Sequence, residues 1–394
     1  MTVTAKPHTP LYIDTPAAAQ RLFASLEHVR TIAVDTEGAS FHRFVDRIYL
    51  LQLSTEQVTA VLDPLAIGVP ERLGRLLESP DVEVIFHDAD YDLRLLHQDY
   101  GWHTTHIFDT RIAAQLLGIR AFGLAALLDR YFGLKLDKKY QRADWSMRPL
   151  TPGMLEYAAQ DTMYLLELRN RMRDDLEQIE RWGWAEEEFA RLEGTRWEPA
   201  TGADGESNDG FLRIKGARDL SRRQLALLRE LVQWRDSVAR ELDRATFRVV
   251  GNAALLAAAS RSPRSMEALR AIKGMPRGIM ERRGDEILAA IERGSAVPDA
   301  ELPRFPKAQR WDRDPDFDTR VSRLRAVRDE AAQRLDLDPG VLCSRDRLEA
   351  IGRRKPATLA ELAQVDGLRR WQIAELGEEI LNAVKSDGSK VSAS

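Results

Sequence analysis

The sequence predicts an α/β domain, with a mixed sheet flanked by helices, followed by two all-α helical bundles. Three observations lead to this prediction. Apolar, strand-like runs alternate with helical patterns up to Leu150, the pattern becomes wholly helical from Thr151, and a set of turn residues recurs with a spacing of 93 residues in the second half. A chain of 394 residues is too long for one ordinary domain, which agrees with several modules.

The first part begins with a helix whose N-cap is supplied by Asp14-Thr15. Three strands follow, and the short turns between them favour antiparallel pairing. Beyond them, helical and apolar runs alternate, which is typical of a sheet with helices on its faces. In chain order the sequence predicts a helix over 16–26, strands over 31–35, 47–54 and 58–63, a helix over 70–77, a strand over 82–86 and helices over 91–98 and 111–117.

Acidic residues occur at places where these elements can bring them together. Asp35 and Glu37 end the first strand and, being two apart, can face the same spot. Asp92 starts a helix, and Tyr157 and Asp161 lie four apart on one helical face. Each carboxylate alone is better interpreted as a helix cap or a solvated charge. The ordered set instead favours a site for two divalent metals, which needs several hard oxygen ligands and here uses no histidine or cysteine.

The motifs resemble those of a known family. Residues 31–55, 84–96 and 154–168, in that order, resemble the three motifs of the DEDD superfamily of 3′→5′ exonucleases, in its tyrosine-bearing branch. Residues 105–118 and 138–161 are similar to the ribonuclease D family in particular. The resemblance implies a ribonuclease H-like fold and a metal-dependent 3′→5′ exoribonuclease that releases nucleoside 5′-monophosphates.

The same resemblance implies the roles of individual residues. Asp35, Glu37, Asp92 and Asp161 would hold two Mg²⁺ or Mn²⁺ ions, and Tyr157 would position the attacking water. The expected partner is RNA with a single-stranded 3′ end, such as a tRNA precursor.

Neighbouring residues have plainer expected roles. Asp88 and Asp90 compete with Asp92 for the ligand position in the second motif, and we expect Asp88 to cap the helix instead. Asp109 is expected to cap the helix that follows it. His87 ends a strand beside the site, where we expect it to pack without a catalytic role.

A basic loop between the second and third motifs is a candidate for contacting RNA. Lys138, Gln141 and Arg142 can reach phosphates, and Trp145 can stack on a base. A solvated loop with Trp145 packed in the core is an equal alternative.

The second half reads as two copies of one helical module, separated by segments rich in Gly, Pro and Ser. The 93-residue shift pairs Arg235-Asp236 with Arg328-Asp329 and Gly274 with Gly367. The module resembles the helicase and RNase D C-terminal (HRDC) domain. The predicted organisation is an exonuclease domain over 1–193, a linker over 194–212, HRDC domains over 213–295 and 317–386, a Pro-rich linker over 296–316, and a tail over 387–394.

Charge is divided unevenly between these modules. Residues 1–210 carry a net charge of −12, residues 211–295 carry +8 and residues 311–385 carry −1. The first HRDC copy is therefore the better candidate for attracting RNA, with Lys273 and Arg277 as candidate contacts. A solvated helical surface is the alternative. We expect the second copy to pack against other domains or to shape the substrate entrance.

Other classes of protein fit the sequence less well. One cysteine, Cys343, excludes an internal disulfide and suits a reducing cytoplasm, and no apolar run approaches the length of a membrane span. The expected state is a cytoplasmic monomer with no membrane partner. A DNA exonuclease stays open because nothing in the sequence identifies a 2′-hydroxyl contact, as does a catalytically idle RNA-binding scaffold. A polymerase proofreading subunit is disfavoured by the HRDC-like second half.

Overall fold

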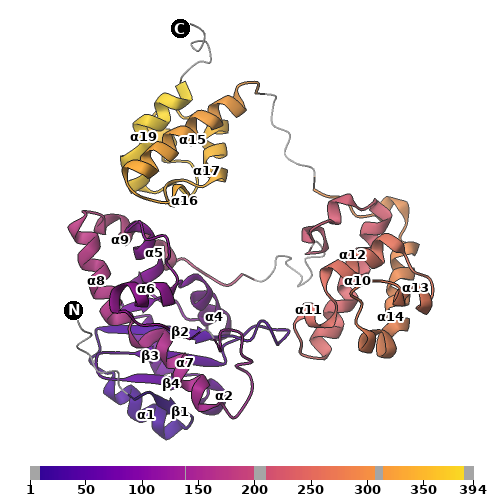
Figure 1. The fold of residues 1–394 in the computed structure, drawn as a ribbon, viewed down its shortest axis with the longest axis horizontal. Coiled ribbons are helices and arrows are strands. Elements are labelled where there is room, and N and C mark those ends of the chain that lie inside the picture. The colour runs from indigo at the N-terminus through magenta and orange to yellow at the C-terminus, as the bar shows by residue number, and fades with distance from the viewer. Residues whose placement is uncertain (1–8, 138, 199–209, 307–313, 386–394) are drawn as a thin grey trace.

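A six-stranded mixed sheet forms the centre of the N-terminal domain (Figure 1). The structure is a computed structural model that describes residues 9–137, 139–198, 210–306 and 314–385. The strand order is β1-β4-β3-β2-β5-β6, and β3 is antiparallel to both of its neighbours while the other pairs are parallel. The strands are β1 (Leu11–Ile13), β2 (Thr31–Glu37), β3 (Leu50–Ser54), β4 (Thr59–Leu62), β5 (Glu83–Phe86) and β6 (Ile107–Asp109).

Helices cover both faces of this sheet. One face carries α1 (Pro16–Ser25), α3 (Glu71–Leu77) and α4 (Asp90–Tyr100), whose apolar side chains share a core with Ile32 and Val34 of β2. Ala33, between them, points into the opposite core. The remaining helices of the domain are α2 (Pro64–Ile67), α5 (Thr110–Leu116), α6 (Leu124–Phe132), α7 (Pro152–Met163), α8 (Leu165–Gln178) and α9 (Trp182–Leu192).

This alternation along β2 decides where its last residues point. Asp35 and Glu37 share the face of Ala33, which α7 and α8 approach, and Thr36 shares the face covered by α4. β2 also continues past Ala33, its last residue paired with β5. The end of the strand is therefore open to side chains from the helices of both layers.

Several predicted elements differ from those in the structure. Strand β3 begins at Leu50 rather than at residue 47, and the three-residue strands β1 and β6 were not predicted because so short a run has no clear periodicity. The helical pattern predicted from Thr151 onward is divided among α7, α8 and α9 up to Leu192, and Glu180 before α9 has a φ of 58°. Asp109 caps α5 as predicted, accepting the N–H of Arg111 at 2.7 Å.

The second half forms two helical bundles whose elements repeat with the predicted spacing. Helices α11 and α16 are 93 residues apart at both ends, as are α12 and α17, and Gly274 and Gly367 have φ of 86° and 82°. The first bundle contains α10 (Arg222–Glu241), α11 (Thr246–Val249), α12 (Asn252–Arg261), α13 (Met266–Arg270) and α14 (Arg277–Ala296). The second contains α15 (Phe317–Arg334), α16 (Pro339–Leu342), α17 (Arg345–Arg354), α18 (Leu359–Leu362) and α19 (Arg370–Lys385).

The two bundles contact the N-terminal domain through equivalent corners. Asp243, after α10, accepts hydrogen bonds from Arg43 Nη1 at 3.2 Å and from the N–H of Phe44 at 3.3 Å. Asp336, its counterpart after α15, accepts from Arg120 Nη2 at 3.4 Å. Both aspartates have positive φ, 44° and 50°. The module therefore uses the same turn twice, against two different parts of the domain.

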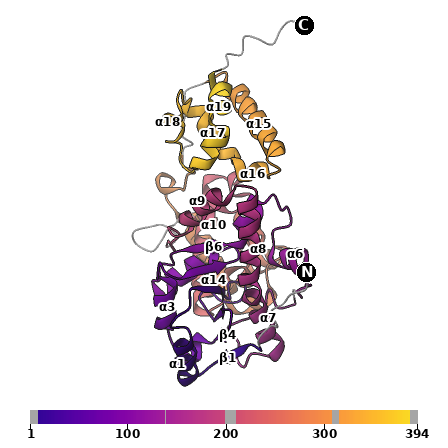
Figure 2. The same cartoon turned by 90° about the vertical axis from the view of Figure 1, so that its left-hand side faces the viewer.

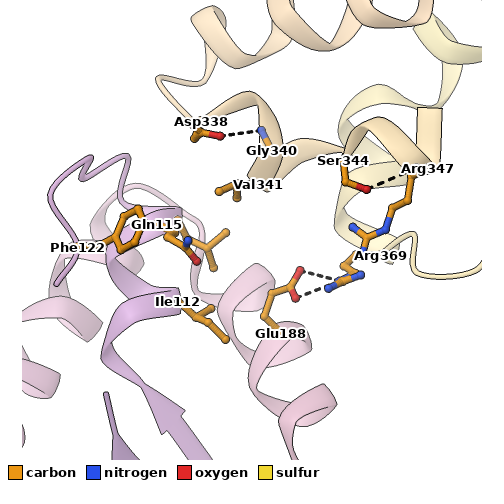
Figure 3. Close-up of a pocket in the computed structure, with 11 residues that line it drawn as sticks. Ile112, Gln115, Phe122, Glu188, Asp338, Gly340, Val341, Ser344, Arg347 and Arg369 are labelled. Atoms are coloured by element: carbon orange, nitrogen blue, oxygen red, sulfur yellow. Dashed lines mark hydrogen bonds and ion pairs between the residues drawn. The ribbon is translucent and has the colours of Figure 1, made fainter. Parts of the chain in front are cut away.

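The second bundle lies beside α9 of the N-terminal domain (Figures 1 and 2). A continuous apolar core joins the two. The rings of Trp184 and Trp371 stack with centroids 4.6 Å apart. Glu188 accepts from Arg369 Nε at 2.9 Å, and Glu187 accepts the N–H of Trp371 at 3.1 Å, near the start of α19. A cavity of about 480 Å³ lies within this interface (Figure 3). The second bundle thus packs against another domain, one of its two expected roles.

No helix in the described ranges is long and apolar enough to cross a membrane.

Candidate active site

The five residues predicted to carry the chemistry line one cleft. Its volume is about 730 Å³, and it lies where β2 ends. Besides Asp35, Glu37, Asp92, Tyr157 and Asp161, the residues around it include Thr36, His87, Asp88, Tyr91, Leu124, Asp137, Gln141 and Gln160. Residues far apart in the sequence are therefore brought to a single place.

Three of the carboxylates form a tight cluster. Asp35, Glu37 and Asp161 each offer an oxygen, and these oxygens all lie within 4.8 Å of one another. The first two extend from the face of β2 that α7 approaches, and α7 carries Asp161. The side chains are partly exposed to the cleft. The spacing suits hard oxygen ligands around one divalent cation.

Asp92 reaches the same cleft from the other helical layer. Its Oδ1 accepts two hydrogen bonds from Thr36, one from the backbone N–H at 2.9 Å and one from Oγ1 at 2.6 Å. Strand β5 offers no partner at this position, because its pairing with β2 stops at Ala33. The open end of β2 therefore holds Asp92, which is 4% exposed, beside the cluster and not within it.

The three clustered carboxylates and Asp92 concentrate negative charge in a mostly buried place. Burial raises the pKa values of Asp35, Glu37 and Asp92 well above the ordinary range, and the neighbouring carboxylates raise them further. Burial, followed by the charge of Asp92, raises the pKa of Asp161 to about 7. Within the described part of the chain, no basic side chain forms an ion pair with any of the four. Such a donor set fits divalent metal ions.

Tyr157 lies on α7, as Asp161 does, and its ring packs against aromatic neighbours. Its ring lies 6.1 Å from that of Trp145 and 6.0 Å from that of Tyr140. Burial and then the charges of Asp161 and Glu37 raise the pKa of the Tyr157 hydroxyl. The hydroxyl therefore stays protonated at neutral pH and can donate a hydrogen bond but is a poor base.

Asp88 does not cap α4, so that prediction is wrong. The N-cap position is Ala89, with no side-chain cap. Asp88 has a φ of 68°, and its carboxylate pairs with Arg111. Asp109 takes over part of the expected role, because it accepts the backbone N–H of Ala89 at 2.7 Å in addition to capping α5.

The basic loop is only partly directed toward the cleft. Gln141 is exposed and lines it, whereas the Arg142 guanidinium lies over the ring of Phe41 at 5.4 Å. Lys138 lies outside the described residues. Trp145 is 1% exposed, so its ring is packed in the core. The packed-core alternative thus holds for Trp145, and no base can stack on it in this conformation.

The basic residues of the first bundle fall into two groups. Some are engaged within the bundle and its flanks: Arg222 and Arg223 bind backbone carbonyls between Ser295 and Leu302, and Arg283 pairs with Glu241 and Glu286. Lys273 is exposed in the turn before α14 and Arg277 is exposed as the first residue of α14, and neither has an ion-pair partner in the ranges that the structure covers.

The arrangement agrees with comparisons to known proteins. A family model described as 3′-5′ exonuclease matches residues 10–177, and the HRDC domain model matches residues 224–291 and 318–384. A ribonuclease D of Granulibacter bethesdensis is 30% identical over 382 residues, covering 95% of this chain and 92% of that protein. The chain belongs to the ribonuclease D family. As a member, it is a 3′→5′ exoribonuclease, and its exonuclease fold implies divalent metals.

Solved structures of ribonuclease D and a related enzyme show the same architecture. Ribonuclease D of Escherichia coli has a TM-score of 0.71 and 26% identity, covering 96% of this chain and 99% of that one. The catalytic core of RRP6 from Trypanosoma brucei has a TM-score of 0.64 and 29% identity, covering 74% and 81%. The predicted combination of exonuclease fold and HRDC bundles is therefore confirmed.

Sequence reasoning missed two residues of the candidate site, Thr36 and Tyr91. Thr36 lies between the predicted ligands Asp35 and Glu37, and alternation along a strand assigns it to the opposite face. On that face its hydroxyl donates to Asp92, another predicted ligand. Tyr91 lines the cleft and donates to Asp46 Oδ2 at 2.6 Å. Its position next to Asp92 was the one available signal.

Proposed function

We propose that this ribonuclease D family member removes nucleotides from single-stranded 3′ ends of RNA with a metal centre built from Asp35, Glu37, Asp92 and Asp161. The observation that supports this proposal most directly is the cluster of three partly exposed carboxylates, whose oxygens lie within 4.8 Å of one another. Two divalent ions, Mg²⁺ or Mn²⁺, are proposed. When bound, they supply Lewis-acid activation of water and neutralise charge at the scissile phosphate.

The protein residues divide the remaining work. Asp35, Glu37 and Asp161 would hold one ion from the α7 side, and Asp92, fixed by Thr36, would hold or orient the second. Tyr157 would orient the attacking water through its protonated hydroxyl, which has no hydrogen-bond partner among the described residues. The products would be nucleoside 5′-monophosphates.

The proposed substrates are structured RNAs with short 3′ tails, including tRNA precursors. The E. coli relative is an exoribonuclease involved in structured RNA processing, which supports this class. Gln141 would contact the RNA at the cleft, and Arg142 and Lys138 would contact it along the neighbouring loop. Lys273 and Arg277, exposed on a bundle of charge +8, would contact phosphates farther from the 3′ end.

The proposed setting is a cytoplasmic monomer. A lone, buried Cys343 supports a reducing compartment. We keep the predicted domain boundaries as part of the proposal, with the exonuclease domain over 1–193 and the HRDC domains over 213–295 and 317–386.

The test is digestion of matched substrates. A 5′-labelled RNA hairpin with a single-stranded 3′ tail, and its DNA counterpart, are incubated with Mg²⁺, Mn²⁺ or EDTA, and products are sized. We expect stepwise shortening of the RNA tail by single nucleotides, only with metal. Faster digestion of the DNA would support a DNA exonuclease, and no digestion of either would support the idle scaffold.

A further inference from the structure

His87 occupies a position in the cleft that neither metal binding nor water positioning uses. It follows the last residue of β5 and lines the same cleft as the carboxylate cluster. Its Nδ1 lies 2.9 Å from Thr110 Oγ1, at the start of α5. Thr110 is fully buried, so this contact fixes the imidazole ring from behind.

The partners of Thr110 determine which ring nitrogen of His87 carries the proton. The Thr110 hydroxyl has a single hydrogen and lies 3.1 Å from the carbonyl oxygen of Phe86, which can only accept. Both hydrogen bonds form only if the hydroxyl donates to this carbonyl and accepts from His87. The proton is therefore on Nδ1 of the neutral ring, and Nε2 carries a lone pair.

His87 lines the cleft, and Nε2 is the ring nitrogen that its contact with Thr110 leaves for a ligand. Nε2 makes no hydrogen bond to a residue in the described ranges. Side-chain atoms that are both buried and without a partner occur in those ranges, but Nε2 is not among them, so it has accessible surface. It can therefore be reached by solvent or substrate. Above pH 7 a histidine is mostly neutral even with an ordinary pKa. Here burial lowers the pKa of His87 to about 4, a shift that Asp88 opposes and Arg111 supports.

In hydrogen bonding, a neutral nitrogen with a lone pair can only accept and therefore needs a donor, and among the described residues His87 is not part of the cluster that could ligate a metal ion. Phosphate oxygens of RNA are acceptors, so they cannot pair with this atom. Base N–H groups differ from one nucleotide to the next, whereas ribose hydroxyls are present on every nucleotide and can donate. We propose that Nε2 of His87 accepts a hydrogen bond from a ribose hydroxyl of the 3′-terminal nucleotide, so that His87 reads the sugar and not the phosphate or the base.

This inference rests on the proposed 3′-end exoribonuclease site and adds a specificity contact to it. If the hydroxyl is the 2′-OH, the contact favours RNA over DNA. If it is the 3′-OH, the contact favours a free 3′ end of either polymer. The two sources differ in one atom of the substrate, so analogues distinguish them.

Two variants of His87 separate its two nitrogens. In His87→Asn the amide lies near the position of Nδ1, so it can keep the Thr110 contact but has no acceptor at the position of Nε2. In His87→Gln the longer side chain can place its amide oxygen near Nε2. The asparagine and glutamine side chains are polar and no larger than histidine. Thermal unfolding checks that each variant is folded.

The experiment measures kcat/KM for full-length protein at pH 8 on RNA whose last nucleotide is ribo, 2′-deoxy or 3′-deoxy. For wild type we expect one deoxy substitution to lower kcat/KM by about threefold to tenfold, the effect of one neutral hydrogen bond. His87→Asn should lose that discrimination while its rate on the deoxy substrate stays near wild type, and His87→Gln should retain part of it.

Two results would overturn the proposal. One is a wild-type enzyme that cuts all three RNAs equally well. The other is His87→Asn that discriminates as strongly as wild type. A wild-type protein that cuts no RNA would count against the proposed site and its function as a whole, and is thus distinct from either result.

Discussion

Replacing Thr36 by valine should weaken metal binding without removing any proposed ligand. Asp92 Oδ1 accepts two hydrogen bonds from this residue, and valine removes the hydroxyl bond of 2.6 Å while keeping the backbone bond of 2.9 Å. A hydrogen bond to a charged group contributes about 1.5–3 kcal/mol. Loss of a partner that orients a metal ligand typically costs about 10- to 100-fold in metal affinity.

The assay is the Mn²⁺ concentration that gives half-maximal RNA hydrolysis. For Thr36→Val we expect this concentration to rise by about 10- to 100-fold, with much of the maximal rate recovered at saturating metal. Thr36→Ser keeps the hydroxyl and should follow the wild-type curve. Overlapping curves for wild type, serine and valine variants would refute the reasoning that Thr36 holds Asp92 in place for metal.

Four further predictions concern the same architecture. Tyr157→Phe should lower single-turnover rate while RNA affinity hardly changes, and an equal loss of affinity with an unchanged rate would mark the hydroxyl as a binding group. Asp92→Asn should reduce activity far more than Asp88→Asn, since Asp88 pairs with an arginine, and the reverse ranking would mean that the second-motif ligand is misassigned. Because the pKa of Asp161 is raised to about 7, the folded metal-free protein holds this proton more tightly than the unfolded chain, so its stability should fall as pH rises from about 4 to 7. Mn²⁺ affinity should increase from pH 6 to 8, because the ligand must lose the proton to bind metal. Flat pH profiles in thermal unfolding and in Mn²⁺ titration would contradict this. Trp371→Ala removes the stacked ring and should lower the unfolding temperature and expose the interface to proteolysis, while single-nucleotide release from short RNA continues; an unchanged protease pattern would show that the bundle is held by other contacts.

The sequence was most informative where local pattern alone decides structure. Alternation along 31–37 correctly paired Asp35 with Glu37 on one face, and the 93-residue repeat anticipated two modules in which α11 and α16, and likewise α12 and α17, begin and end 93 residues apart. Both inferences need only the geometry of a strand or the recurrence of turn residues such as Gly274.

What the sequence could not supply depends on contacts between layers. Asp92 reaches the end of β2 from the opposite helical layer, so its bond to Thr36 cannot be read from the spacing of 56 residues. The same limit applies to Trp145, which is buried in a core cluster with residues of β3, β4 and α7. Asp88 was predicted to be a cap because aspartate is common there, but Asp109 binds the backbone at this point instead.

The contacts by which Asp243 and Asp336 join the two bundles to the N-terminal domain could not be predicted from the sequence either. Asp243 contacts the loop that follows β2, close in sequence to Glu37, while its repeat partner Asp336 contacts Arg120 near α5. One motif therefore binds two unrelated surfaces, which no internal comparison of the copies reveals. This arrangement places the first bundle against the loop adjoining the candidate metal ligands.

The most direct test of the account is metal-dependent RNA degradation by wild type and by Asp35→Asn and Asp161→Asn. Mn²⁺ binding is measured by calorimetry on the same folded proteins, and products from 3′-tailed RNA are sized. The account predicts single nucleotides released from the 3′ end by wild type with metal, and loss of both Mn²⁺ binding and activity by orders of magnitude in the two variants. Near-wild-type rates and affinities in both would contradict the assignment of the carboxylate cluster as the catalytic centre.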